Sequence, residues 1–322
     1  MELMYEGKSK KVFKDDTSDD HVIIEFTDNV TAGDGKKHDV IAGKGKLACE
    51  ISEFFFKFLQ KVGIDTHFVT KMDDTNLRCR KVEILPVEVV CRNRAAGSFC
   101  KRYGIKNGAV LTSPLVEFFL KDDKLHDPLI AEDAIIRLGI AQDPVVAYMK
   151  SVTLSVNHYL SELFKQIKLT LVDFKLEFGM TGDKQIVLAD EISGDTMRVW
   201  NAKGKSYDKD LYRKGKGDIT VAYSFLLEQL SKTSEESVPI RDESVHVLVM
   251  PKDGIKNPPG EVTKKALARL GFGDVKTLQV GKVFEIHLAK PVTSDILKQL
   301  TLMSLKLLSN PISEKHLVRL DA

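Results

Sequence analysis

The sequence is poor in cysteine and tryptophan. Its 322 residues include only four cysteines and one tryptophan. The cysteines, Cys49, Cys79, Cys91 and Cys100, have neither CxxC spacing nor a histidine cluster beside them, which argues against a zinc site. We therefore expect free thiols in a reducing cytosol, with a single disulfide as the alternative.

The sequence also lacks a large excess of charge of either sign and long apolar runs. The 48 Lys and Arg nearly balance the 46 Asp and Glu, so no broad basic field is available for nucleic acid or an anionic membrane. No stretch reaches the roughly 18 apolar residues of a membrane helix, and the first residues lack the apolar core of a signal peptide. We expect a cytoplasmic protein with no nucleic-acid or membrane partner, whose phosphate recognition is local.

Length and composition predict two domains. The chain is about twice the common domain size, and its 43 % hydrophobic residues are typical of globular proteins. Residues 235–243 are polar, contain a proline and lack an apolar period, which is typical of a linker. We expect one domain at residues 1–234 and another at residues 244–322.

Apolar periodicity in the first domain predicts an α+β fold. A period near 3.6 predicts helices at residues 44–62, 132–138, 144–167 and 218–230. Alternation predicts strands at residues 10–14, 22–26, 67–71, 77–84, 87–92, 170–178 and 185–192.

The second domain shows a shorter pattern. We expect a strand at 245–250, a helix at 259–270, one or two strands within 275–288, a helix at 294–308 and a strand at 316–320. This is the order of a small ferredoxin-like α/β sandwich.

The first candidate site is a glycine among lysines near the N-terminus, at Gly7, Lys8 and Lys10. In a strand, Lys8 and Lys10 would project to one face, where two ammonium groups suit a triphosphate and Gly7 lets the backbone approach. The alternative is a solvated turn.

The second candidate site is the hairpin formed by LVDFKLEFG and IVLADEIS. Alternation places Asp173, Lys175 and Glu177 on one face, and the second strand brings Asp190. Opposed carboxylates together with nucleotide phosphates suit Mg²⁺. The alternative is a salt-bridged strand face in water.

The third candidate site is the string CRNRAAGSFCKR, in which arginines precede a turn of small residues and a serine. The guanidinium groups of Arg92 and Arg94 beside the hydroxyl of Ser98 could hold a phosphomonoester. A basic surface loop is the alternative.

Six strings in one order resemble the SAICAR synthetase family of purine biosynthesis, over about residues 5–230. They are YEGKSK, TAGDG, CRNRAAGSFCKRYG, PLVEFFLKDDKLHDPLI, LVDFKLEFG and LADEIS. The resemblance implies a carbon–nitrogen ligase that uses MgATP to join L-aspartate to the carboxylate of an aminoimidazole ribonucleotide (CAIR). It also implies two lobes similar to protein kinases and ATP-grasp enzymes.

The resemblance also implies roles for particular residues. It places Gly7, Lys8 and Lys10 at ATP, and Glu177 and Asp190 at Mg²⁺. It assigns the nucleotide phosphate to Arg92, Ser98 and Arg198 and, in the same cleft, the imidazole carboxylate to Asp34, Asp173 and Lys175, with Lys121 and Asp127 nearby.

The sequence departs from the family pattern at Gly194, where proline is usual, and at Asn201, where aspartate is usual. We expect a looser turn at Gly194 and a missing charge at Asn201. A kinase-like phosphotransferase and a nucleotide-binding adaptor without catalysis are the competing interpretations of the chain.

Residues 243–321 resemble the small subunit of formylglycinamidine ribonucleotide synthetase, through VLVMPKDGIKNPPG, ALARLGFGDVKTLQVGKVFEI and KLLSNP. The resemblance implies a non-catalytic scaffold that associates with the large synthetase and glutaminase subunits. Because exposed sheet edges favour pairing, we expect a homo-oligomer. A relic module that only dimerises the fusion is the alternative.

Overall fold

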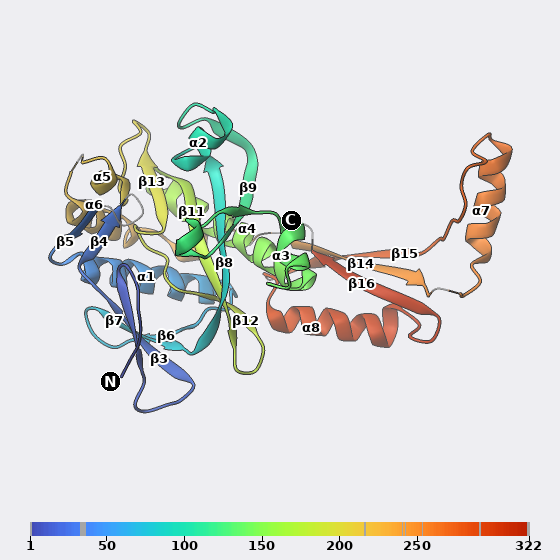
Figure 1. The fold of residues 1–322 in the computed structure, drawn as a ribbon, viewed down its shortest axis with the longest axis horizontal. Helices are drawn as coiled ribbons and strands as arrows, with labels where there is room; N and C mark the ends of the chain where they lie inside the picture. The colour runs from blue at the N-terminus through green and yellow to red at the C-terminus, as the bar shows by residue number, and fades with distance from the viewer. Residues whose placement is uncertain are drawn as a thin grey trace. The chain divides into compact units, whose positions relative to one another are not determined.

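The chain divides into two compact units, Met1–Arg241 and Asp242–Ala322. The computed structural model, drawn in Figure 1, describes residues 2–32, 37–215, 217–239, 241, 243–252, 254–289 and 291–320. Among the helices of these residues, none combines the length and the hydropathy that a membrane span requires.

Two antiparallel sheets form the framework of the first unit, and a short pair of strands, β4–β5, lies beside them. The strand order is β1-β2-β3-β7-β6 in one sheet and β10-β9-β8-β11-β12 in the other, where β13 also pairs with β11. The strands are β1 (Leu3–Glu6), β2 (Lys10–Lys14), β3 (His21–Phe26), β4 (Asn29–Ala32), β5 (Lys37–Val40), β6 (Phe68–Lys71), β7 (Asn76–Arg80), β8 (Val82–Arg94), β9 (Val110–Leu120), β10 (Leu129–Ile130), β11 (Leu169–Thr181), β12 (Ile186–Ala189) and β13 (Met197–Asn201).

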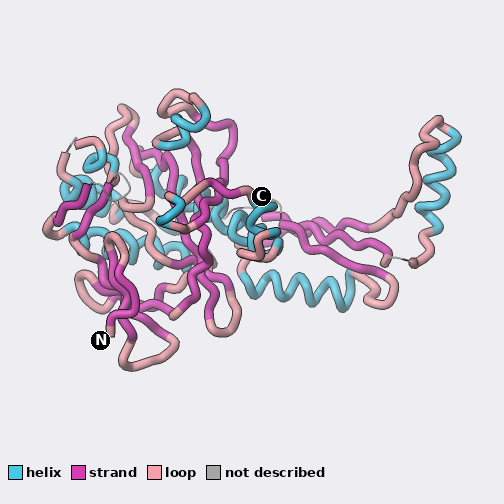
Figure 2. Tube along the Cα trace, viewed as in Figure 1, coloured by secondary structure: helices cyan, strands magenta, loops and turns pink. Residues whose placement is uncertain are grey.

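Helices cover these sheets (Figure 2). The helices are α1 (Lys44–Lys61), α2 (Ser98–Tyr103), α3 (Glu132–Arg137), α4 (Asp143–Gln166), α5 (Asp210–Arg213) and α6 (Ile219–Leu230), with short 3₁₀ turns at Asp123–Leu125 and Glu235–Ser237. Helix α1 contacts β3, β6 and α6, whereas α4 packs on β8, β9 and β11. The apolar face of α1 buries Phe55, Phe56 and Phe58 completely, so the 3.6-residue period that predicts this helix also forms its core contact.

Most expected elements are confirmed, with two informative differences. The strand expected at residues 77–84 is divided between β7 and β8, and β8 continues through Pro86 into the run expected at residues 87–92. The Pro86 carbonyl accepts a hydrogen bond from the Lys121 backbone N–H. Strands β9 and β13 are not predicted by the pattern. Strand β9 contains Pro114, which usually argues against a strand.

The segment with the composition of a linker is held against the first unit up to residue 241. The Gln166 side chain bonds to Ser234 and Ser237, and His158 Nε2 lies 2.9 Å from the Pro239 carbonyl. Arg241 donates to the Ser155 hydroxyl at 2.8 Å. Side-chain hydrogen bonds, which composition does not reveal, therefore order this segment.

The second unit contains one antiparallel sheet of order β15-β14-β16. Its elements are β14 (Glu243–Pro251), α7 (Pro258–Arg269), β15 (Lys282–Leu288), α8 (Ser294–Met303), a π-helical turn (Ser304–Leu308) and β16 (Glu314–Leu320). Val245, Val247 and Val249 of the central strand are buried. Only one strand forms within residues 275–288, so the described sheet lacks the fourth strand of the expected ferredoxin-like order.

All four cysteines are free. Cys49, Cys79 and Cys91 are buried, and burial raises the pKa of the Cys49 and Cys91 thiols to about 12. Cys100 is half-buried on α2.

Candidate functional site

Strand β11 carries the alternating charges of the site. Asp173 and Glu177 are only 2 % and 3 % exposed, whereas Phe174, Leu176 and Phe178 fill the other face. The alternative interpretation, a salt-bridged strand face in water, is therefore wrong for these two carboxylates. Strand β11 pairs with β8 along one edge and with β12 and β13 along the other, so side chains of these strands flank its charged side chains on the same face.

Two arginines flank Asp173 from opposite sides. In the strand register, Asp173 faces Arg92 of β8 and Arg198 of β13. Arg92 donates from Nη1 to Asp173 at 2.8 Å and from Nε to Glu117 at 2.6 Å. Burial alone would lower the pKa of Arg198, but the Asp173 and Asp210 carboxylates raise it above its usual value. Both guanidinium groups are thus held in position by carboxylates.

Arg92, Ser98 and Arg198 meet at one pocket of about 360 Å³, which we call the charged pocket. Its lining also includes Lys8, Thr31, Val90, Asp173, Phe174, Lys175, Asp195, Thr196, Met197, Lys209 and Arg213. Ser98 begins α2 directly after Gly97, whose φ is 59°. A Cβ atom on Gly97 would lie 2.7 Å from Arg198 Nη2, so the glycine makes room for the guanidinium.

Lys175 lies among carboxylates. Its Nζ is 2.7 Å from Glu88 and 2.8 Å from Glu177, and Lys121 also pairs with Glu177. Burial lowers the pKa of Lys175, but the charge of Glu177, followed by Glu88 and Asp190, raises it well above the usual value. Lys175 is therefore an ammonium ion.

The N-terminal hairpin brings one lysine into contact with two carboxylates that directly follow β12. Lys10 Nζ lies 2.5 Å from Asp190 and 2.8 Å from Glu191, and it is nearly buried. Lys8, in the turn after Gly7, reaches outward to Asp123 at 2.7 Å and lines the charged pocket. The two lysines thus have different partners, which strand alternation does not predict.

Glu177 and Asp190 are the candidate Mg²⁺ ligands. Glu177 pairs with Ala189 in the register of β11 and β12, and Asp190 follows directly after β12 with a positive φ of 63°. The strand expected at residues 185–192 therefore ends before Asp190. The charges of Lys10 and Lys175 hold the pKa of Asp190 well below its usual range, although burial opposes them. Asp190 is therefore a carboxylate ion, and Glu177 pairs with Lys121 and Lys175. Carboxylate oxygens suit a hard cation. No group of three or more Asp, Glu, His or Cys with a metal-binding arrangement occurs in the described ranges.

Asp127 is not among the residues that line the charged pocket. Asp34 lies outside the described residues. Asp127, at φ 45°, accepts a hydrogen bond from the Asp122 backbone N–H at 3.0 Å.

Sequence reasoning misses a buried charge network next to the charged pocket. Lys44 is completely buried and pairs with Asp195, while Lys209 lies 3.6 Å from the same carboxylate. Tyr223 donates to Asp195 at 3.1 Å. Burial raises the pKa of Asp195, but Lys44 and Lys209 lower it to about 2 overall. Lys44 begins the predicted helix, where a lysine is usually solvated, so its sequence position does not reveal this role.

The departures from the family pattern have local explanations. A Cβ atom on Gly194 would lie 2.2 Å from Tyr223 Cε1, so the Tyr223 ring occupies the space that a larger residue would need. The Asn201 side chain accepts from the Lys203 and Lys205 backbone N–H groups at 3.0 and 2.9 Å. Asn201 therefore stabilises the turn that follows β13.

Comparison with known proteins gives a match for each unit. The SAICAR synthetase family matches residues 3–230, and PurS, described as phosphoribosylformylglycinamidine (FGAM) synthase, matches residues 244–322. The phosphoribosylaminoimidazole-succinocarboxamide synthase of Finegoldia magna is 46 % identical over 231 residues, which are 71 % of this chain and 99 % of that protein.

Two solved structures support the match of the first unit to the SAICAR synthetase family. The phosphoribosylaminoimidazole-succinocarboxamide synthase of Ehrlichia chaffeensis has a TM-score of 0.70 at 39 % identity, over 72 % of this chain and 100 % of that one. A SAICAR synthetase in complex with ADP has a TM-score of 0.69 at 42 % identity, over 72 % of this chain and 99 % of that one.

Proposed function

This chain belongs to the SAICAR synthetase family of purine-biosynthetic ligases, and we propose that its first unit joins L-aspartate to the carboxylate of CAIR in the cytosol, with ATP as the energy source. The observation that carries the proposal is the convergence of Arg92, Ser98 and Arg198 on the charged pocket. Fixed guanidinium groups beside a hydroxyl suit the phosphate of a ribonucleotide.

ATP would lie against the N-terminal hairpin. Lys8 and Lys10 supply ammonium groups, and the structural relative in complex with ADP supports a nucleotide site in this fold. Glu177 and Asp190 are the residues that would hold Mg²⁺, which neutralises phosphate charge when bound. A β-rich lobe that covers the nucleotide, as in kinases and ATP-grasp enzymes, is part of this proposal.

The chemistry follows from the weakness of a carboxylate as an electrophile. Transfer of the γ-phosphoryl group to the CAIR carboxylate would give an acyl phosphate, and the aspartate amine then displaces phosphate. Lys175, held charged by Glu177 and Glu88, stabilises the negative charge that develops. Asp173 orients Arg92 and Arg198 and, with Asp34, would border the imidazole ring. Lys121 would act through Glu177, and Asp127 through the neighbouring turn.

We propose that the second unit is a non-catalytic assembly module for the large synthetase and glutaminase subunits, and that it pairs with its own copies. Val262 of α7 and Leu270, which follows that helix, are 68 % and 74 % exposed, and both β15 and β16 are sheet edges. Apolar residues and open edges of this kind suit association. Residues 240–322 as bait should recover the two subunits from cell extract, whereas capture of this chain alone would favour a relic dimerisation module.

The test of the ligase is the dependence of ADP release on the other substrates. The proposal expects ADP only when CAIR and aspartate are both present, in a 1:1 ratio with SAICAR. ADP release without aspartate, together with a stable phosphorylated product, would instead identify a kinase-like phosphotransferase. Binding of ATP without any turnover would identify an adaptor.

A further inference from the structure

A second pocket of the first unit, of about 760 Å³, contains none of the residues that line the charged pocket. It lies between the start of β11, the turn after β13, α5 and the loop after α2, and we call it the tryptophan pocket because Trp200 lines it. Its lining also includes Arg94, Asn107, Thr170, Lys203, Lys205, Asp210, Leu211 and Lys214. The volume is in the range of small-molecule sites, roughly 300–1,000 Å³.

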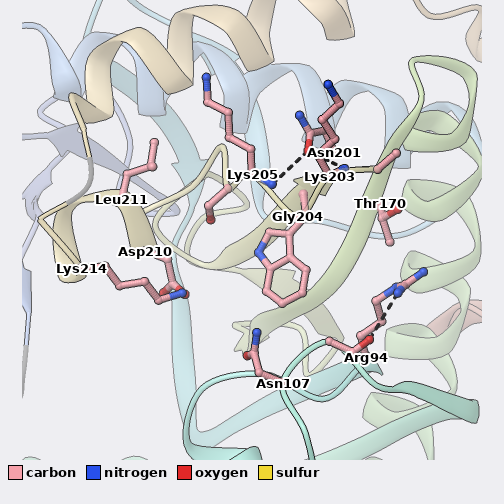
Figure 3. A pocket seen from close by; sticks show the side chains of 14 residues that line it. Arg94, Asn107, Thr170, Asn201, Lys203, Gly204, Lys205, Asp210, Leu211 and Lys214 are labelled. Carbon is pink, nitrogen blue, oxygen red and sulfur yellow. Dashed lines mark hydrogen bonds and ion pairs between the residues drawn. The ribbon is translucent and has the colours of Figure 1, made fainter.

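The charges of this pocket favour an anion. Within the described chain, Arg94, Lys203 and Lys205 have no ion pair, and Figure 3 shows Arg94 on the opposite side of the pocket from Lys205. The acidic residue in the lining, Asp210, is already bonded to Lys214 at 2.7 Å. Its carboxylate also accepts from Arg198 and Arg213, so little of its negative charge is left to repel a ligand.

The lining also offers an apolar surface and uncharged donors. Trp200 is 9 % exposed and packs on Ala96 and Val172, so its ring is held in place. No hydrogen bond from the indole N–H is found in the part of the chain that the structure describes, and Trp200 lines the cavity. Leu211 adds apolar surface nearby. An aromatic ring with polar edges suits such a wall.

We propose that the tryptophan pocket binds an aromatic phosphate monoester of the mononucleotide class. The phosphate pairs with Lys203, Lys205 or Arg94, and the ring lies against Trp200 and Leu211. Asn201 accepts from the backbone N–H groups of both lysines, which orders the turn that carries them. The Lys203 and Lys205 side chains are exposed, and the Lys205 ammonium lies 5.3 Å from the centroid of the Tyr207 ring. The site is separate from the one proposed for CAIR and does not depend on the ligase activity.

The chain's single tryptophan makes its fluorescence a reporter of this pocket. The experiment titrates the full chain with AMP, adenosine and inorganic phosphate and follows the tryptophan emission. A double variant, Lys203→Glu with Lys205→Glu, tests the pocket. Lys265→Glu with Lys276→Glu, two exposed lysines of the second unit, is the control with the same charge change. Circular dichroism confirms that each variant is folded.

The proposal expects saturable AMP binding in the wild type and the control, at least tenfold weaker binding in the double variant, and weaker binding of adenosine and phosphate than of AMP. Ser98→Asp, which adds negative charge to the charged pocket, should leave the AMP response unchanged. A response that is lost in Ser98→Asp but kept in the double variant would overturn the proposal, as would the absence of saturable binding. If phosphate binds as tightly as AMP, the proposed contribution of the ligand's aromatic ring to binding would be refuted.

Discussion

Arg198 Nη1 donates to both carboxylate oxygens of Asp173, at 3.0 Å to Oδ1 and 2.8 Å to Oδ2. Arg92 reaches Oδ2 of the same carboxylate from the neighbouring strand on the other side. A single buried acid thus fixes two of the three groups proposed to hold the substrate phosphate. The site therefore depends on strand register as much as on residue identity.

Asp173→Asn should destabilise the first unit by about 3 kcal/mol, because it leaves the buried guanidinium of Arg92 and the half-buried one of Arg198 with less countercharge. Urea unfolding measures the loss. Asp133→Asn is the matched control, since it breaks an exposed Asp–Arg pair in which both side chains are more than 70 % exposed. Its effect should be too small to resolve, and equal losses in the two variants would contradict the assigned role of Asp173.

Gly97→Ala should raise the KM for CAIR by roughly tenfold, equivalent to about 1.4 kcal/mol for a displaced charged hydrogen bond. The added Cβ would lie 2.7 Å from Arg198 Nη2 and push the guanidinium away. Gly104→Ala is the control. Gly104, at the other end of α2, also has positive φ, at 66°, but its Cβ would meet nothing within 4 Å. A KM that rises equally in both variants would indicate backbone strain alone.

Asp190→Asn and Glu177→Gln should each raise the Mg²⁺ concentration for half-maximal ligase rate by about tenfold or more, because each removes a charged ligand. Steady-state rates over a Mg²⁺ series measure the shift. Asp183→Asn, in the turn of the same hairpin, removes an acid that accepts from Thr181 and should change nothing. An unchanged Mg²⁺ requirement in both test variants would remove the metal assignment.

His67 should make the protein less stable in acid. Its ring is buried against Phe56, Nε2 lacks a hydrogen-bond partner among the described residues, and burial lowers the pKa of His67 to about 4. Between pH 6.5 and 4 the unfolded chain binds the proton and the folded chain does not. Stability from this group is therefore complete above about pH 6.5 and falls by about 3 kcal/mol as the pH approaches 4.

His67→Gln removes this titration. The difference in unfolding free energy between wild type and variant should be constant above pH 7 and should shift against the wild type as the pH falls to 4. Urea unfolding at a series of pH values measures that difference. A difference that stays flat over the whole range would show that His67 is not a buried neutral imidazole.

The alternation along β11 and the glycine before α2 are visible in the sequence because each is a local pattern with a local cause. The burial of Asp173 and Glu177 is not visible in the sequence, since it depends on which strands pair with β11. Lys44 shows most clearly what the sequence alone does not predict. Its partner Asp195 is about 150 residues away, and only tertiary packing turns a solvated helix start into a fully buried ion pair.

The distribution of the thiols has a practical consequence. Burial protects Cys49, Cys79 and Cys91 from modification and keeps their thiolate forms scarce, whereas Cys100 is half-buried on the short helix that begins with Ser98. A maleimide fluorophore should therefore attach at one position of the native chain without any engineered mutation. That label would lie next to the proposed phosphate-binding turn, where its emission can follow substrate arrival in real time.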